Sequence, residues 1–363
     1  MKKLLLLCAL CGIFSFQAKA DIETTDNITI SELQSGEYGS FFTVSLEGSD
    51  TYYTAFEITL EFPEGLSVQL YEGELDVYRC DKSPLFKAGR NSTDHTVSPS
   101  FGQVGDRKLK VVCVSTKNKD FGATSGDLFD VYVTASPYMK PGESLIKSSD
   151  VFFVDNTTGQ AINNVCAPVS FPIEIASERQ IELNISATQQ WNTCVLPFST
   201  ELPKGVKAFE GTTVEGDYLI LKEATTLEAF TPYLLYAENG YNGTVEGTVS
   251  EDDYVTVANG GPLKGAIMPQ QITEGYVLQD QGNGMMFYNV NNRNFTIPSG
   301  KCWVATGGNA QAIRIGFGET GIESMPAAPT TNQPIYTLDG KRVSTPQKGN
   351  VYIIGGKKAL YLK

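Results

Sequence analysis

The chain has 363 residues, of which 41% are hydrophobic, so it is long enough for two or three domains with buried cores. Only 19% of the residues are charged, whereas there are 35 glycines, 17 tyrosines and 19 phenylalanines, a composition typical of turn-rich β structure. The single histidine, His95, argues against catalytic triads and histidine-ligated metals, and the net charge of −13 argues against a nucleic-acid partner. We therefore expect an all-β protein without a cofactor.

The first twenty residues have the pattern of a secretory signal peptide. Met1-Lys2-Lys3 is basic, Leu4 to Phe16 is an apolar stretch too short to span a bilayer comfortably, and Ala18-Lys19-Ala20 has the small residues that signal peptidase requires. We expect cleavage after Ala20 and a location outside the cell or on its outer surface. No later segment has the roughly 20 apolar residues of a membrane span, so none is expected in the mature chain.

The cysteines that follow the predicted signal peptide do not have the pattern of a disulfide framework, because they are odd in number, widely spaced and without a CxxC motif. They are Cys80, Cys113, Cys166, Cys194 and Cys302. Buried free thiols are the favoured interpretation, and one bridge between Cys194 and Cys302 is the alternative. A catalytic thiol is not expected, because only His95 could activate it, and the polar run around His95 predicts a solvated loop.

Alternation of apolar and polar residues predicts a first β-sandwich over residues 21–176. In Thr54–Phe62 the even positions are mostly large and apolar, and Pro63-Glu64-Gly65 ends the strand. Phe129, Val131 and Val133 alternate with more polar neighbours in the same way. This spacing of short strands and turns is typical of a jelly-roll-like sandwich of about eight strands.

A second, similar domain is predicted over residues 177–320. A polar connector, Ala176–Gln180, precedes a new series of short strands, which are separated by turn sequences such as Pro203-Lys204-Gly205. No stretch of a dozen residues keeps helical periodicity. The sequence thus predicts two consecutive β-sandwich domains.

A small C-terminal β module is predicted over residues 335–363, behind a linker at 321–334. The linker contains Pro326–Thr331, whose composition resists packing. The module carries six basic residues against Asp339 alone, so its charge is opposite to that of the rest. Two local hairpins are expected within it, and we predict that they form their sheet without strands from the second domain.

The tail resembles the C-terminal sorting domain of proteins exported by the type IX secretion system of Bacteroidetes. The resemblance rests on Ile335–Val343 and Lys348–Ile354, followed by Gly356-Lys357-Lys358. It implies that the secretion machinery is a partner and that the tail is a signal, commonly removed on surface attachment. The implied motif residues are Leu338, Asp339, Gly340, Gly349, Tyr352, Lys357 and Lys358.

The first domain resembles cohesin-type and related carbohydrate-binding jelly rolls. The similar segments are Tyr53–Ile58, which leads to Phe62–Val68, and later Gly126–Val131. This resemblance implies a non-catalytic module that binds another molecule. It does not indicate which surface of the domain binds.

No catalytic or metal-binding constellation is present, so we predict that the protein is not an enzyme. Glu251-Asp252-Asp253 lacks the spacing of a calcium loop and is expected to be a solvated turn. The leading hypothesis is a secreted or cell-surface module that binds a polysaccharide or a protein. The alternatives are a carboxylate-based extracellular hydrolase, which needs two carboxylates in a cleft, and a structural spacer of a surface assembly.

Aromatic side chains on one strand face could stack on sugar rings, although most rings in a sandwich belong to the core. The candidates are Tyr52, Tyr53, Tyr71, Tyr78, Tyr132, Trp191, Tyr233, Tyr236 and Tyr241. An exposed coplanar row of such rings would favour a glycan ligand.

Overall fold

The computed structural model describes residues 26–47, 51–74, 77–82, 95–102, 106–117, 119–155, 161–162, 170–282, 284–291, 293–306, 310–317, 322–324, 334–338, 340–347, 351–354 and 357–360. All regular secondary structure within these residues is β-strand, which confirms the all-β prediction. These residues contain no helix that could cross a membrane. The chain divides into unit 1, residues 1–136 and 142–175, and unit 2, residues 137–141 and 176–363. The predicted signal peptide and Ala20 lie outside the described residues.

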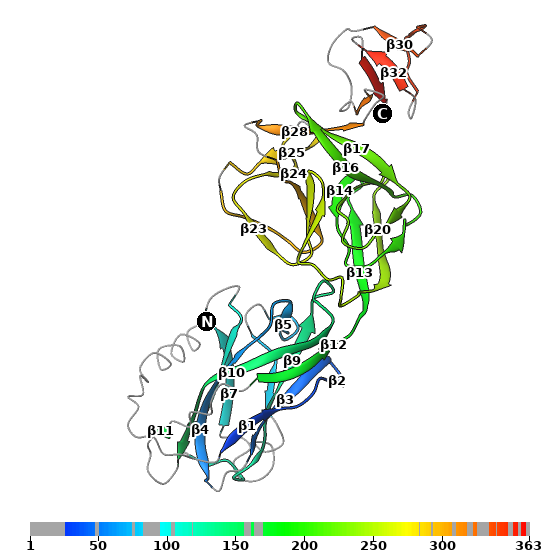
Figure 1. The fold of residues 1–363 in the computed structure, drawn as a ribbon. Coiled ribbons are helices and arrows are strands. Elements are labelled where there is room, and N and C mark those ends of the chain that lie inside the picture. The colour runs from blue at the N-terminus through cyan, green and yellow to red at the C-terminus, as the bar shows by residue number, and fades with distance from the viewer. Residues whose placement is uncertain are drawn as a thin grey trace. The chain divides into compact units, whose positions relative to one another are not determined.

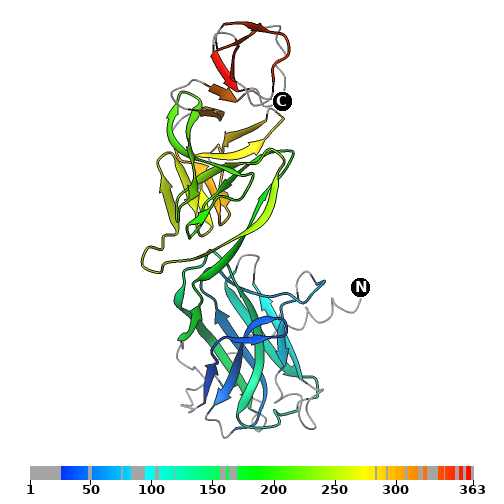
Figure 2. The same ribbon diagram turned by 90° about the vertical axis from the view of Figure 1, so that its right-hand side faces the viewer.

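Unit 1 is a sandwich of two antiparallel sheets (Figure 1). The first sheet has the order β1 (Asn27–Ile30), β3 (Gly39–Glu47), β9 (Gly126–Ala135), β5 (Leu66–Val68), with β2 (Gln34–Gly36) on β3 and β6 (Cys80–Lys82) on β9. The second has the order β11 (Ala161–Ile162), β10 (Gly142–Asp155), β4 (Tyr53–Glu61), β8 (Lys108–Ser115), β7 (His95–Phe101), with β12 (Ser170–Ile175) on β10. The strands can be followed from a second side in Figure 2.

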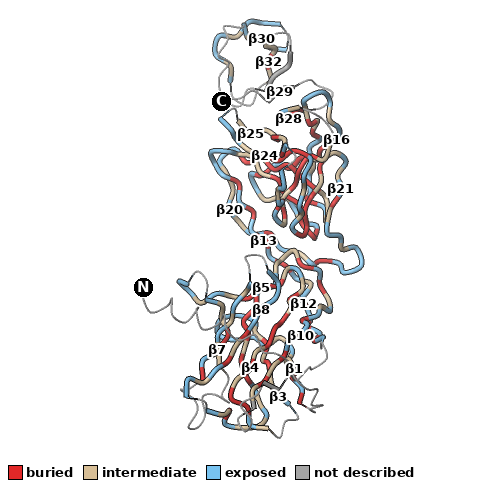
Figure 3. Tube along the Cα trace, turned by 90° about the vertical axis from the view of Figure 1, so that its left-hand side faces the viewer, coloured by how far each residue is buried: buried red, intermediate tan, exposed pale blue. Residues whose placement is uncertain are grey.

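Alternating residues of the two sheets form the core of unit 1. Phe56, Ile58 and Leu60 of β4 are buried, as the sequence pattern predicts, and β8 adds Leu109 and Val111. In Figure 3 the buried residues follow the strands through the interior. Burial of one face of each strand fixes the register, because a slip by one residue would expose the whole apolar set.

His95 corrects one prediction. It is the first residue of β7, its side chain is 1% exposed, and its ring lies edge-on to Phe121 at 5.4 Å. The polar residues before it had indicated a solvated loop. The pairing of His95 with Ser115 of β8 places its side chain in the core instead.

Unit 2 is built around one strongly curled sheet. Its first part has the order β21 (Val257–Gly260), β22 (Leu263–Ala266), β27 (Lys301–Val304), β24 (Tyr276–Asp280), β25 (Met285–Asn289), β28 (Ala312–Phe317). β28 then pairs in parallel with β17 (Tyr218–Ala224), which continues through β16 (Lys207–Glu215) and β19 (Tyr233–Tyr236) to β14 (Trp191–Cys194). Buried residues of both parts, such as Leu219, Leu234, Tyr276 and Phe287, share one core cluster.

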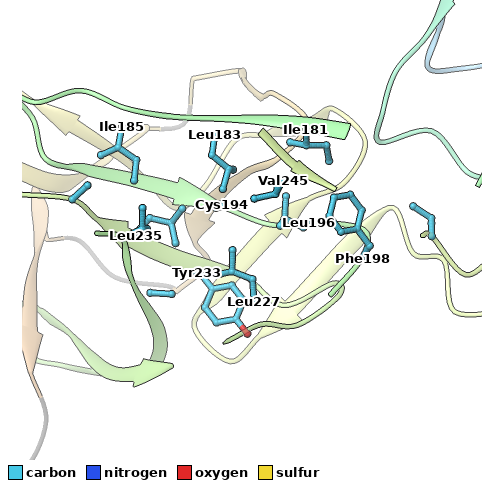
Figure 4. Close-up of a cluster of buried hydrophobic side chains, with 14 residues drawn as sticks. Ile181, Leu183, Ile185, Cys194, Leu196, Phe198, Leu227, Tyr233, Leu235 and Val245 are labelled. Atoms are coloured by element: carbon cyan, nitrogen blue, oxygen red, sulfur yellow. The ribbon is translucent and has the colours of Figure 1, made fainter. Parts of the chain in front are cut away.

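A second core cluster of unit 2 lies against the pair β13 (Glu178–Ile185) and β20 (Tyr241–Thr248). Figure 4 shows Ile181, Leu183 and Ile185 of β13 pointing toward Cys194 and Leu235. Two short pairs complete the unit: β15 (Thr200–Glu201) with β18 (Thr226–Leu227), and β23 (Gln270–Ile272) with β26 (Phe295–Ile297).

The described cysteines confirm the favoured interpretation of buried free thiols. Cys80, Cys113, Cys194 and Cys302 are buried and form no disulfide, while Cys166 lies outside the described residues. The alternative bridge is wrong, since both thiols are free and the Cys302 Sγ donates to the backbone oxygen of Cys194 at 3.1 Å. Burial raises the pKa of Cys194 to about 12, so its thiol stays protonated at neutral pH.

The tail contains the two predicted hairpins. β30 (Ile335–Thr337) pairs with β31 (Arg342–Val343), and β32 (Val351–Ile354) pairs with β33 (Lys357–Leu360). The tail sheet extends beyond these hairpins, because β29 (Ile322–Ser324), inside the predicted linker, pairs with β33 and also with β28 of unit 2.

Candidate functional site

The most distinctive feature on the outer side of unit 1 is a half-buried arginine, Arg79, that lies against three tyrosine rings, of which Tyr38 is exposed and Tyr132 is buried. The guanidinium carbon of Arg79 lies 3.8 Å from the ring centre of Tyr38, 4.6 Å from that of Tyr71 and 5.5 Å from that of Tyr132. Phe41 packs on Tyr132 with ring centres 5.2 Å apart. We call these five residues the Arg79 surface.

The sheet register brings the Arg79 surface together on the outer face of the first sheet. In β3 the residues Phe42, Val44 and Leu46 are buried, so Phe41 points outward, and it lies opposite Tyr132 of β9. Tyr38 lies just before β3. Arg79 precedes β6 and holds the neighbouring backbone, because its N–H donates to Gln69 O and its carbonyl accepts from Tyr132 N–H.

Acidic residues continue this outer face beside the aromatic rings. Asp81 of β6 lies opposite Asp130 of β9. Asp81 accepts a hydrogen bond from the Tyr71 hydroxyl, and Asp130 accepts one from Thr43 Oγ1 at 2.7 Å. Burial, followed by the hydrogen bond to Asp81, raises the pKa of Tyr71, and burial near Asp81 and Asp130 raises that of Tyr132. Both phenols are therefore neutral hydrogen-bond donors at physiological pH.

The Arg79 guanidinium retains its capacity to donate. Among the described residues its only side-chain interactions are the contacts with the three rings, and no carboxylate or carbonyl accepts from it. An arginine side chain has five N–H donors in a planar fork that matches a carboxylate. The hairpin around it also exposes Leu70 and Val77, and Tyr38 is 49% exposed. The surface is thus an apolar, aromatic patch around a pre-positioned donor group.

The predicted aromatic candidates fall into different places. Tyr71 and Tyr132 belong to the Arg79 surface, Tyr52 is 52% exposed, and Tyr53 and Tyr233 are fully buried. The remaining four lie elsewhere: Tyr78 packs against Phe101, Trp191 and Tyr236 pack against each other, and half-buried Tyr241 lies in β20. Tyr38 and Arg79 were not among the predicted binding residues. The position of Tyr38 in the turn between β2 and β3 is the signal that could have identified it, because binding residues are often found on connecting segments.

The rings of the Arg79 surface do not form a coplanar row. The planes of Tyr38 and Tyr132 are inclined by 69°, and those of Phe41 and Tyr132 by 31°. In unit 2 the planes of Trp191 and Tyr236 are inclined by 51°. This geometry does not present a flat platform for a sugar chain, and it favours recognition of an irregular surface.

Two cavities of about 400 Å³ each have a single acidic lining residue, Glu182 in one and Asp217 in the other. Neither brings together two carboxylates of the kind a glycosidase needs. Asp81 and Asp130 are neighbours, but they lie on an open sheet face.

Glu251 of the predicted acidic turn forms an ion pair with Lys140 at 3.2 Å. The described residues contain no group of three potential metal ligands.

The sorting-motif residues occupy varied positions in the tail. Leu338 is 57% exposed, Gly340 has a φ of +84° in the first hairpin turn, and the buried Tyr352 accepts a hydrogen bond from Gln347 N–H at 2.8 Å. Lys357 and Lys358 begin β33. Asp339 and Gly349 lie outside the described residues.

No model of a protein family matches the chain, and no curated protein matches it. Among solved structures it is similar to a cohesin module from a family 33 glycoside hydrolase of Clostridium perfringens, with 15% identity over 42% of this chain and 98% of that one and a TM-score of 0.31. The chain is also similar to the type II cohesin dyad of the ScaA scaffoldin of Acetivibrio cellulolyticus, with 10% identity over 77% of this chain and 98% of that one and a TM-score of 0.29. A third similar structure is the major pilin subunit BcpA of Bacillus cereus, with 12% identity over 80% of this chain and 68% of that one and a TM-score of 0.28. All three TM-scores are below 0.5.

Proposed function

We propose that the chain is a secreted, non-catalytic binding protein whose unit 1 docks a protein partner on the Arg79 surface. The observation that carries the proposal is the Arg79 guanidinium, which contacts three tyrosine rings and has no acceptor among the described residues. Tyrosine and arginine are enriched among the residues that dominate binding energy at protein interfaces. The partner is a protein segment with a carboxylate or a free backbone carbonyl for Arg79 and apolar side chains for Leu70 and Val77.

Export is the second part of the proposal. It rests on the signal-peptide pattern up to Ala20 and on the resemblance of the tail to a type IX sorting domain. A polysaccharide ligand is the second candidate for unit 1, because the Arg79 surface is rich in aromatic rings. Their inclined planes make a protein partner the better match.

A photocrosslinking experiment on the producing cells tests the docking surface. The chain offers a matched control, since Tyr38, just before β3, and Tyr52, just before β4 of the other sheet, are tyrosines of nearly equal exposure. We expect benzoylphenylalanine at position 38 to give one discrete adduct with a protein, and the same group at position 52 to give none. Because interface arginines are often hot spots, Arg79→Ala should weaken binding of the identified partner by about 30-fold, and Arg79→Lys by nearly as much.

Three outcomes would contradict this proposal. Equal adducts at positions 38 and 52 would mean that the Arg79 surface is not the docking site. Saturable glycan-array binding by the mature chain, lost in Tyr38→Ala, would favour the polysaccharide. The absence of any adduct or glycan binding would favour the structural spacer.

A truncation after Met325 tests the role of the tail in export. We expect the shortened protein, made in its native host, to be absent from the cell surface. Since the short β29–β33 ladder is the only pairing that joins the tail sheet to the preceding strands among the described residues, the thermal unfolding midpoint of residues 21–325 should stay close to that of the mature chain. Surface display of the truncated protein would contradict the sorting role. A much lower midpoint would show that the tail is an integral layer of unit 2.

A further inference from the structure

A cavity of about 400 Å³ in unit 2 has a lysine in its wall. It is lined by β13, by Pro137 and Tyr138, by Asn192–Cys194 and by Ser299–Lys301. Its volume is within the range of small-molecule sites. The cavity is distinct from the Arg79 surface, which lies in unit 1.

Lys301 has no negatively charged partner among the described residues. Its ammonium donates to Asn192 Oδ1 at 2.8 Å, which leaves two of its three N–H groups for another acceptor. Glu182 also lines the cavity but forms no ion pair with Lys301. The nearby thiols of Cys194 and Cys302 supply no negative charge, because burial raises the pKa of both. Burial has the opposite effect on the pKa of Lys301, which it lowers, because it disfavours the charged ammonium.

The position of the Lys301 ammonium is fixed by its surroundings. The Asn192 side chain cannot turn freely, because its Nδ2 donates to Asn184 O at 2.6 Å and its Oδ1 also accepts from Thr193 N–H at 2.9 Å. The Lys301 backbone N–H donates to Pro298 O at 3.2 Å. A half-buried cation held in this way is unfavourable unless an anion compensates it.

We infer that this cavity binds a small organic monocarboxylate, with its carboxylate on Lys301 and its apolar part toward β13. The aliphatic residues Ile181, Leu183 and Leu235 line the same cavity and suit a short alkyl chain. The carboxylate accepts the two remaining N–H groups of the ammonium, and Asn184 and Ser299 provide further polar lining.

Hexanoate is a suitable probe, and hexanamide is its uncharged counterpart of nearly equal shape. In calorimetric titrations of the full mature chain, we expect hexanoate to bind saturably in the millimolar range or tighter, and hexanamide to bind at least about 10-fold more weakly. Lys301→Met should reduce hexanoate affinity by about 10-fold or more, whereas Lys207→Met, at an exposed lysine of the same unit, should not change it.

Chemical labelling of the unmodified protein keeps the test decisive if Lys301→Met fails to fold. We expect hexanoate to slow acetylation of Lys301 by about 10-fold, as measured by mass spectrometry of peptides, with no effect on Lys207 and none from hexanamide. The proposal is overturned if hexanoate does not bind saturably or if hexanamide binds equally well. Protection of Lys207 to the same extent as Lys301 would also overturn it.

Discussion

Replacing Gly240 by alanine is expected to lower the free energy of unfolding of unit 2 by about 2–5 kcal/mol. Gly240 lies between β19 and β20 with a φ of +75°. An added Cβ would lie 2.7 Å from Ala187 N and 2.8 Å from Ile185 O, both of which are backbone atoms that cannot rotate away. The left-handed conformation and the steric overlap both oppose the alanine.

Gly216 provides a control that separates these two causes. It lies in the turn between β16 and β17 with a φ of +62°, and an added Cβ would meet nothing within 4 Å. Gly216→Ala should therefore cost only the conformational strain, about 1–2 kcal/mol. Both values can be measured by urea denaturation followed by tryptophan fluorescence, because the two tryptophans, Trp191 and Trp303, both lie in unit 2. Equal losses would show that the close approach to Ala187 is relieved at no cost.

Replacing Phe56 by alanine is expected to be the most damaging core change in unit 1, at about 3–5 kcal/mol. Phe56 is 2% exposed at the middle of β4. Its ring stacks on Phe129 at 5.6 Å and lies 6.0 Å from both Phe121 and Phe153. The alanine would leave a cavity among three rings, of which Phe129 lies in β9, Phe153 in β10 and Phe121 in the segment between β8 and β9, and they cannot all close on it.

Phe152→Ala is the matched control for Phe56→Ala. Phe152 precedes Phe153 in β10 but is only half-buried, so its loss should cost about 1 kcal/mol or less. Calorimetric unfolding gives the change in stability, and amide hydrogen exchange of β4 and β8 locates it in unit 1. A similar loss for both variants would contradict the central role assigned to the Phe56 cluster.

For strands with a clear alternating pattern, the sequence alone was sufficient to predict both the strand and the face that it buries. Alternation in Thr54–Phe62 identified β4 and its buried residues, because the side chains of a strand alternate between faces with period two. The Asp339-Gly340 dipeptide indicated the first tail hairpin, since Gly340 takes the positive φ that its turn requires. Such features depend on neighbouring residues only, and neighbouring residues are visible in a sequence.

Strand partners distant in the chain were decided by the tertiary structure. The parallel pairing of β17 with β28 and the pairing of β29 with β33 join segments whose local patterns do not identify one another. His95 is buried for the same reason, because its pairing with Ser115 overrides the polar residues before it.

Both candidate sites also depend on such distant contacts. Tyr38, Tyr71, Arg79 and Tyr132 meet only because β3, β9 and the hairpin before β6 are neighbours in one sheet. Lys301 and Asn192 are 109 positions apart in the sequence. Alternation within a strand identified its buried face in β4, whereas the register of distant strands decided the burial of His95 and which polar and exposed residues lie together, because one local pattern is compatible with many pairings.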